Sequence, residues 1–241
     1  MAVGKRKIVG VMGGMGPEAT VDFMAKVIAL TDSTRDQDHV HMIVDNDPTI
    51  PNRQMAINSG IDDVSSRLEA MARRLESAGA DFLVMVCNTA HHFLDPVIKS
   101  TGIPFLSIID ETVKEIDRVC ASSRKVGVMA TDSCLGTKIY QDAISASGRV
   151  AIVPDSANLE QLMNLITSIK AGDKSAQVVK GMESVARSLA DAGAEIIIAG
   201  CTEIPIVFEG DGFPVPVVAS TNVLARRTVE YAMGLVPLPD R

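Results

Sequence analysis

The sequence predicts an α/β protein of two pseudo-symmetric lobes, each a mostly parallel sheet flanked by helices. Three observations lead to this prediction. Short apolar segments alternate along the chain with longer segments of helical pattern, as in βαβ units. Most of the short segments are apolar throughout, which is typical of parallel strands covered on both faces. In addition, stretches of the first half recur in the same order in the second half.

The expected strands are short runs rich in Val, Ile and Leu. In chain order they are 7–12 (KIVGVM), 40–45 (VHMIVD), 81–86 (DFLVMV), 103–108 (IPFLSI), 125–130 (KVGVMA), 149–153 (RVAIV), 195–199 (EIIIA) and 215–219 (VPVVA). The expected helices cover about residues 17–31, 61–78, 91–100, 110–121, 133–147, 158–171, 174–192 and 221–233. His39 and His41 alternate with apolar residues, so we place them on one strand face without a ligand role.

The two halves resemble each other in three places. The matched stretches are 7–14 with 125–132, 76–90 with 190–204, and 103–113 with 215–225. The offset is 117 residues from Val9 to Val126 and 114 from Cys87 to Cys201. Near-equal offsets in one order indicate a duplicated unit. We therefore expect a first domain over residues 1–115 and a second over 116–220, with a C-terminal helix at about 221–241 packing back onto the first.

Bulk composition excludes several classes of function. The chain of 241 residues has 30 acidic and 23 basic residues and a net charge of −7, without a basic stripe, which argues against a nucleic-acid partner. No apolar segment is long enough to span a membrane, and the start lacks the pattern of a signal peptide. The four cysteines form no CxxC pair. We expect a cytoplasmic protein with reduced thiols.

Cys87 and Cys201 each stand at the carboxyl end of an apolar strand and are followed at once by polar residues. Open parallel sheets bind ligands beyond these strand ends, so we expect both thiols to face a cleft between the lobes. One thiolate can remove a proton from a carbon while the other thiol returns a proton to the opposite face. This inverts a stereocentre and requires neither a metal nor an organic cofactor. Cys120 and Cys134 are interpreted as buried structural thiols.

Other interpretations of these residues carry less weight. A disulfide between Cys87 and Cys201 conflicts with a ligand lying between them. Metal binding by Cys87, His91 and His92 lacks a second ligand cluster. The segment GVMGGMGPEAT at 10–20 matches neither the dinucleotide nor the Walker motif, but glycines before a helix can form an anion cradle.

Basic and acidic side chains near these motifs have ordinary explanations as well. Arg53 could bind a carboxylate through two nitrogens, yet composition alone favours a solvated surface arginine. Lys170, at the end of a predicted helix, has a similar status because lysines there commonly interact with the helix dipole. Glu203 could orient water or a substrate ammonium, or cap a helix.

The chain resembles the aspartate/glutamate racemase superfamily, the cofactor-independent amino-acid racemases. The resemblance rests on GGMGPEAT at 13–20, NDPTIPNR at 46–53, VCNTAHH at 86–92, IKAG at 169–172 and GCTEIP at 200–205. These motifs follow the family's order and span nearly the whole chain. The resemblance implies interconversion of L- and D-aspartate, and of glutamate as a further substrate, without a cofactor, in an enzyme that commonly forms homodimers.

The resemblance also implies roles for particular residues. Cys87 and Cys201 are then the two acid/base thiols. Asn88, Thr89 and Thr202 hold the α-carboxylate and ammonium, and the loop of Gly14 and Met15 touches the substrate. Arg53 and Lys170 hold the side-chain carboxylate, and Glu203 joins the substrate site. Where some aspartate racemases carry a tyrosine one turn before the lysine, this chain has Ile166.

Alternative functions stay open at this point. A maleate cis-trans isomerase on the same scaffold would use one cysteine as a nucleophile towards the alkene, and a hydantoin racemase is a further enzyme of the same kind. A non-catalytic dicarboxylate or amino-acid binder would have no need of two matched thiols.

Overall fold

The computed structural model describes residues 6–210 and 212–239. The contacts divide the chain into two compact units: unit 1 comprises the residues up to Ile108 and from Leu224 onward, and unit 2 comprises Ile109–Val223. The division therefore falls near the start of α5 (Ile108–Cys120) and within α10 (Ser220–Ala232). The sequence had placed it after residues 115 and 220; residues 1–5, 240 and 241 of the expected domains lie outside the described part.

Each unit contains one parallel sheet, and the predicted fold class is confirmed. In unit 1 the order is β2-β1-β3-β4, with β1 at Val9–Gly13, β2 at Met42–Asn46, β3 at Phe82–Met85 and β4 at Phe105–Leu106. In unit 2 the order is β6-β5-β7-β8, with β5 at Lys125–Met129, β6 at Val150–Ile152, β7 at Ile196–Ala199 and β8 at Val217–Ala219. The central strands β1, β3 and β7 are buried at every residue, which explains their uniformly apolar sequences.

The two sheets repeat each other down to the strand register. Val9 pairs with Phe82 in unit 1, and Val126 pairs with Ile196 in unit 2. Gly10 approaches Leu83, Ala80 and Leu75, and Gly127 approaches the counterparts of these three side chains, Ile197, Ala194 and Leu189. A glycine at the same point of both sheets thus lets a helix pack closely on the strand. The recurrence noted in the sequence corresponds to a repeat of structure.

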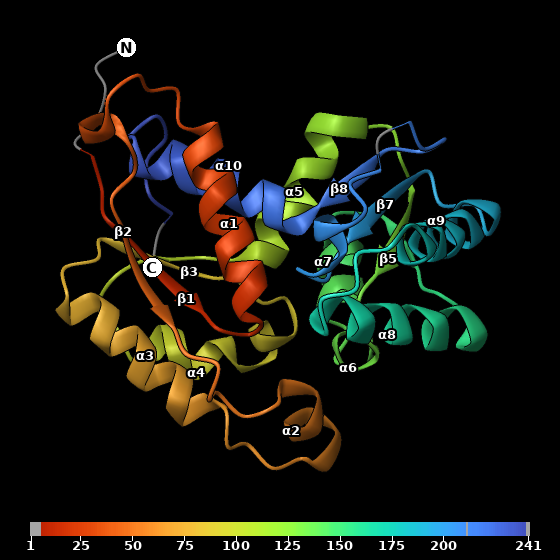
Figure 1. The fold of residues 1–241 in the computed structure, drawn as a ribbon, viewed down its shortest axis with the longest axis horizontal. Coiled ribbons are helices and arrows are strands. Elements are labelled where there is room, and N and C mark those ends of the chain that lie inside the picture. The colour runs from red at the N-terminus through yellow and green to blue at the C-terminus, as the bar shows by residue number, and fades with distance from the viewer. Residues whose placement is uncertain (1–5, 211, 240–241) are drawn as a thin grey trace. The chain divides into compact units, whose positions relative to one another are not determined.

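Helices cover both faces of the sheet in unit 1. Figure 1 shows α3 (Ser65–Ser77) and α4 (Leu94–Lys99) along one face, and α1 (Pro17–Leu30) and the C-terminal part of α10 along the other. The backbone amide of Lys7 donates to the carbonyl of Ala232 at 2.8 Å, and Phe82 lies against Tyr231, so α10 is tied to this sheet.

Helices also flank the sheet of unit 2. There α9 (Ala176–Asp191) packs on β5 and β7, and α8 (Ser156–Lys170) packs on α9. The remaining helices of unit 2 are α5, α6 (Asp132–Gly136), α7 (Ile139–Ala146) and the 3-10 turn η3 (Ile204–Ile206).

Several helix predictions were wrong in their limits. The helix expected at 133–147 is broken into α6 and α7, because Lys138 adopts a left-handed conformation with φ of 62°. The helix expected at 61–78 begins only at Ser65, where the Asp62 carboxylate accepts the backbone amides of Val64 and Ser65. The helix expected at 91–100 consists of the 3-10 turn η2 (Thr89–Phe93) followed by α4.

The sequence analysis also missed one helix and misplaced one strand. Helix α2 (Arg53–Ser59) lies where no helix was expected; the Asn52 side chain caps its start and Gly60, with φ of 70°, ends it. His39 and His41 do not lie in a strand, since the 3-10 turn η1 (Asp36–Asp38) precedes them and β2 begins at Met42. Within the described part of the chain, no helix is both long and apolar enough to cross a membrane.

Replacing Gly10 with Ala tests the close packing of helix on strand. The added Cβ would lie 2.7 Å from Leu83 Cδ2, so we expect a destabilisation of about 1–3 kcal/mol from overpacking. Gly127→Ala should destabilise the protein less, because the atom nearest to its added Cβ lies 3.1 Å away. Gly136→Ala serves as the control, since no atom lies within 4 Å of its added Cβ. Thermal unfolding measures all three, and a Gly10 variant as stable as the Gly136 variant would contradict this packing.

Candidate active site

The loop after β1 is shaped by glycine. Gly14 has φ of +92°, and a Cβ at this position would lie 2.3 Å from backbone atoms of Asp47. The backbone amide of Gly14 donates to Thr20 Oγ1 at 3.0 Å, which ties the turn to the first turn of α1. The turn therefore requires glycine for its conformation and for the close approach of the next loop. The side chain of Met15 is buried in the hydrophobic core of unit 1, so the backbone forms the loop surface.

Cys87 lies at the same edge of this sheet. The backbone amide of Val86 donates to the carbonyl of Met12 at 3.0 Å, one residue beyond the paired strands. This bond holds Cys87 beside the Gly13–Gly14 turn. The thiol is 6% exposed, and Asn88 and Thr89, which follow it, are buried. All four cysteines of the chain are free thiols.

His91 is built into the backbone around Cys87. Its Nδ1 lies 2.8 Å from the carbonyl oxygen of Cys87, and its Nε2 accepts the backbone amide of Ile108 at 3.2 Å. A ring nitrogen that accepts a hydrogen bond carries no proton. The ring proton is therefore on Nδ1, which donates to the carbonyl oxygen of Cys87. Burial lowers the pKa of His91 to about 4, so the ring is neutral. His91 therefore fixes the Cys87 loop and has both nitrogens occupied, which argues against its service as a metal ligand.

Arg53 links two loops of unit 1. Its guanidinium donates to the carbonyls of Ile50 at 3.1 Å and Pro51 at 2.9 Å, and makes a longer contact of 3.5 Å with the carbonyl of Met15. The structure thus brings Arg53 to the Gly14–Met15 loop. As the first residue of α2, Arg53 is held by the Asn52 cap beside it.

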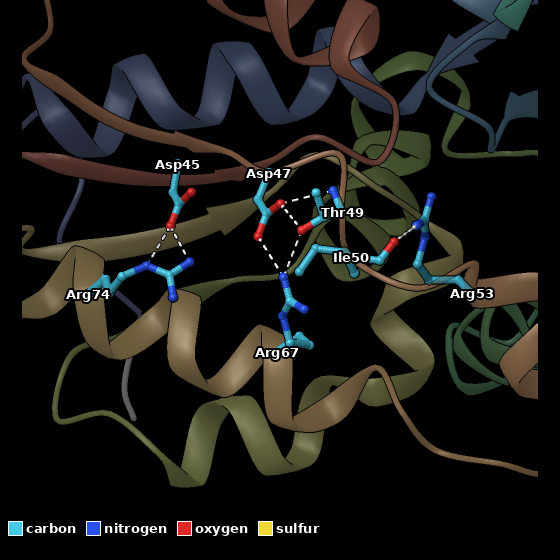
Figure 2. A network of polar contacts seen from close by, with 7 residues as sticks. All are labelled: Asp45, Asp47, Thr49, Ile50, Arg53, Arg67 and Arg74. Atoms are coloured by element: carbon cyan, nitrogen blue, oxygen red, sulfur yellow. Dashed lines mark hydrogen bonds and ion pairs between the residues drawn. The ribbon is translucent and has the colours of Figure 1, made fainter.

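The end of β2 and the loop between β2 and α2 are anchored to α3 by arginines. Figure 2 shows Arg67 directed towards Asp47 and Thr49, and Arg74 directed towards Asp45. Arg67 donates to Thr49 Oγ1 at 2.7 Å and to Asp47 Oδ2 at 3.2 Å. Hydrogen bonds from Thr49 hold the pKa of Asp47 below its usual value. These ion pairs are partly exposed and individually weak, but together they define the loop that carries Arg53.

The second thiol lies at the matching position of unit 2. The backbone amide of Gly200 donates to the carbonyl of Met129 at 2.7 Å. This is the counterpart of the bond that holds Cys87 in unit 1. Cys201 is 6% exposed, and Thr202 and Glu203 are also buried.

A buried carboxylate organises the surroundings of Cys201. Glu203 Oε2 accepts the Cys201 thiol at 3.0 Å and the Thr202 hydroxyl at 3.2 Å. Glu203 Oε1 has no hydrogen bond among the described residues, but Lys170 Nζ lies 3.6 Å away as an ion pair. Lys170 is the last residue of α8, and its side chain is 41% exposed. The structure therefore gathers Lys170, Thr202 and Glu203 around one thiol.

Burial raises the pKa of Cys201 well above its ordinary value, and the negative charge of Glu203 raises it further. Lys170 acts in the opposite direction, as a positive charge that favours the thiolate. Because burial is the largest influence, Cys201 holds its proton at neutral pH.

Ile166 lies one helical turn before Lys170. Its side chain is 2% exposed and belongs to the hydrophobic core of unit 2. This position therefore presents no polar group to a ligand.

Sequence reasoning missed the structural roles of His91 and Thr20. Both stand inside motifs that the sequence analysis quoted, VCNTAHH and GGMGPEAT, but their hydrogen bonds are made to backbone groups that spacing does not reveal. Only the polar character of these residues, within motifs next to apolar strands, was available as a signal.

A profile of the family described as Asp/Glu/Hydantoin racemase matches residues 12–228. The chain belongs to this racemase family. The resemblance carried by the sequence motifs is thereby confirmed.

Individual relatives span nearly the whole chain. The broad specificity amino-acid racemase RacX of Bacillus subtilis (strain 168) is 29% identical over 227 residues, covering 92% of this chain and 96% of that protein. The structure of an aspartate racemase from Picrophilus torridus matches with a TM-score of 0.83 and 29% identity over 94% of both chains. An aspartate racemase homologue from Pyrococcus horikoshii OT3 matches with a TM-score of 0.76 and 25% identity, over 94% of this chain and 99% of that one.

Replacing His91 with Gln tests its neutral, bridging role. A histidine whose pKa is lowered to about 4 by folding stabilises the protein above pH 6.5 and loses this contribution as the pH falls towards 4. The wild type should therefore lose about 2 kcal/mol from this group between pH 7 and pH 5. His91→Gln should lack this loss and should be less stable at pH 7 by about 1–3 kcal/mol.

Urea unfolding at pH 7 and pH 5 measures the effect. The exposed neighbour His92 provides the matched control through His92→Gln, since folding does not bury its ring. An equal pH dependence in the His91 variant would contradict a neutral ring at this position.

Proposed function

We propose that this protein is a pyridoxal-phosphate-independent amino-acid racemase that interconverts L- and D-aspartate, and that Cys87 and Cys201 carry the proton. One observation carries the proposal: each sheet holds a buried thiol at the equivalent position, fixed by the equivalent backbone bond, from Val86 to Met12 and from Gly200 to Met129. A repeat of the packing alone does not require a cysteine at this position in both units. Membership of the racemase family supports the same conclusion.

The proposed reaction balances within the protein and its substrate. The thiolate of one cysteine removes the Cα proton and becomes a thiol, leaving a carbanion stabilised by the adjacent carboxylate. The thiol of the other cysteine gives its proton to the opposite face of Cα and becomes a thiolate. One turnover thus exchanges the protonation states of the two cysteines, and turnover of the opposite enantiomer restores them.

The state described here suits Cys201 as the donor. Its proton is retained by burial and is directed at Glu203 Oε2, 3.0 Å away. When Cys201 acts as the base, it is the thiolate left by its preceding donation, and its proton has gone to Cα of that product.

Substrate recognition follows from the loops at the two sheet edges. We propose that Asn88, Thr89 and Thr202 bind the α-carboxylate and ammonium, with the backbone of Gly14 and Met15 beside them. Arg53 and Lys170 would bind the side-chain carboxylate of an acidic substrate, and Glu203 would complete the polar site. A carbanion next to a carboxylate requires strong stabilisation, which oriented backbone amides supply in a buried site.

A broader substrate range is the second candidate. The similarity to a broad specificity amino-acid racemase favours it, and so does Ile166, which offers no hydroxyl to an acidic side chain. The two candidates share one reaction and differ only in the side chains accepted.

Incubation with amino acids in D₂O, without pyridoxal phosphate, tests reaction type and substrate together. We expect L-aspartate to yield D-aspartate carrying deuterium at Cα, with glutamate and neutral amino acids as comparisons. Cys87→Ala and Cys201→Ala should each abolish racemisation, because each removes one of the two proton carriers. Cys120→Ala, at a thiol outside both sheet edges, is the control. Undiminished racemisation by the Cys87 variant would refute the mechanism, and exchange confined to neutral amino acids would refute the substrate.

Replacing Glu203 with Gln tests the electrostatics of Cys201. The negative carboxylate raises the pKa of this thiol, so a neutral amide should let the thiolate form at lower pH. The rate of alkylation by iodoacetamide, followed at Cys201 by mass spectrometry across a pH series, should rise at lower pH than in the wild type. Glu160→Gln, at an exposed position of α8, is the matched control. If the pH at which the alkylation rate of Cys201 reaches half its maximum were unchanged or higher in Glu203→Gln, this account would be contradicted.

A further inference from the structure

Tyr140 is a fully buried tyrosine of α7 whose ring lies against the backbone that carries Cys201. It is 0% exposed. A Cβ added at Gly200, the residue before Cys201, would lie 2.8 Å from Tyr140 Cε2 and 3.3 Å from Cζ. Glycine is therefore needed at 200 to let the ring approach, and the ring limits where the Cys201 backbone can lie.

The hydroxyl of Tyr140 is hydrogen-bonded on both sides. Its partners are the side chains of Thr112 and Ser220, both of which are 0% exposed. Burial raises the pKa of Tyr140 above its ordinary value. The phenol therefore remains protonated and can both donate and accept a hydrogen bond. A phenylalanine would fill the same volume without the cost of burying a hydroxyl, so the hydroxyl is present for these two bonds.

These two partners stand on the helices that connect the units. Thr112 is in α5, shortly after the chain enters unit 2 at Ile109, and Ser220 is the first residue of α10, shortly before the chain leaves unit 2 at Val223. A single phenol thus joins both connecting helices to α7, within unit 2. The same side chain touches the strand end that presents Cys201.

We propose that Tyr140 is a positioning residue for Cys201: its hydroxyl fixes α5 and α10 to α7, and its ring thereby fixes the Gly200–Cys201 backbone for proton transfer. This inference rests on the proposed function in taking Cys201 as a proton carrier. Tyr140 itself does not touch the reacting atoms. Proton transfer is sensitive to such positioning, since a misplacement of about 1 Å can cost on the order of a hundredfold in rate.

Tyr140→Phe removes one oxygen and keeps the ring against Gly200. We expect kcat to fall roughly tenfold with KM little changed, because the thiol moves while the substrate contacts stay. The rate of iodoacetamide alkylation should change several-fold at Cys201 and remain that of the wild type at Cys87. The other tyrosine provides the control: Tyr231→Phe, in unit 1, loses the bond from Arg227 and should alter neither Cys201 alkylation nor kcat.

The outcomes separate this inference from the proposed function. Wild-type alkylation at Cys201 together with wild-type kcat in Tyr140→Phe would overturn it, even in an active racemase. Altered alkylation at Cys201 in a protein that racemises nothing would support the positioning role and reject the function. Should Tyr140→Phe fail to fold, Thr112→Val and Ser220→Ala remove one partner each, and each must shift Cys201 alkylation in the same direction for the inference to stand.

Discussion

One backbone hydrogen bond, made twice, fixes the positions of the two matched thiols of this protein. In each unit the amide of the residue before the cysteine donates to the end of the neighbouring central strand, from Val86 to Met12 and from Gly200 to Met129. The bond extends the parallel pairing by one residue and then releases the chain. Each thiol consequently lies at the first position outside the sheet, where its partners can be polar and its backbone is still held by the core.

The surroundings of the two thiols differ although their backbones match. The side chain that holds the loop of Cys87 is neutral, because His91 lies between two backbone groups as an uncharged ring. The side chain that contacts Cys201 is charged, because Glu203 accepts a hydrogen bond from the thiol and is paired with Lys170. A duplicated scaffold has thus acquired two electrostatic environments. For a reaction in which one group gives a proton and the other takes it, such a difference is useful.

Much of this arrangement was predicted from the sequence, and each part that was not has a physical cause. The strands were predicted because their apolar runs directly reflect burial on both faces. Cys87 and Cys201 were found because strand ends are fixed by the same runs. Helix α2 was missed although Asn52 and Gly60 mark its ends, because Pro48 and Pro51 precede it and prolines are typical of loops. The break at Lys138 gave no signal, since lysine is not a residue that favours the left-handed conformation.

The side-chain contacts of the site could not be predicted from the sequence for a further reason. The bond from Ile108 to His91 joins residues 17 apart, and Lys170 reaches Glu203 from another element altogether. Such pairs depend on how helices and strands pack, and neither periodicity nor motif spacing encodes them. Family motifs pointed to Lys170 and Glu203 separately, as groups that face a substrate. The structure adds that they face each other.

The unequal exposure of this ion pair makes the second thiol sensitive to ionic strength. Lys170 is 41% exposed while Glu203 is 5% exposed, so dissolved ions reach the ammonium and are kept from the carboxylate. Added salt therefore weakens the charge that favours the thiolate and leaves intact the charge that opposes it. The nucleophilicity of Cys201 should accordingly decline as the electrolyte concentration rises. The salt concentration around the protein thus influences the reactivity of this thiol.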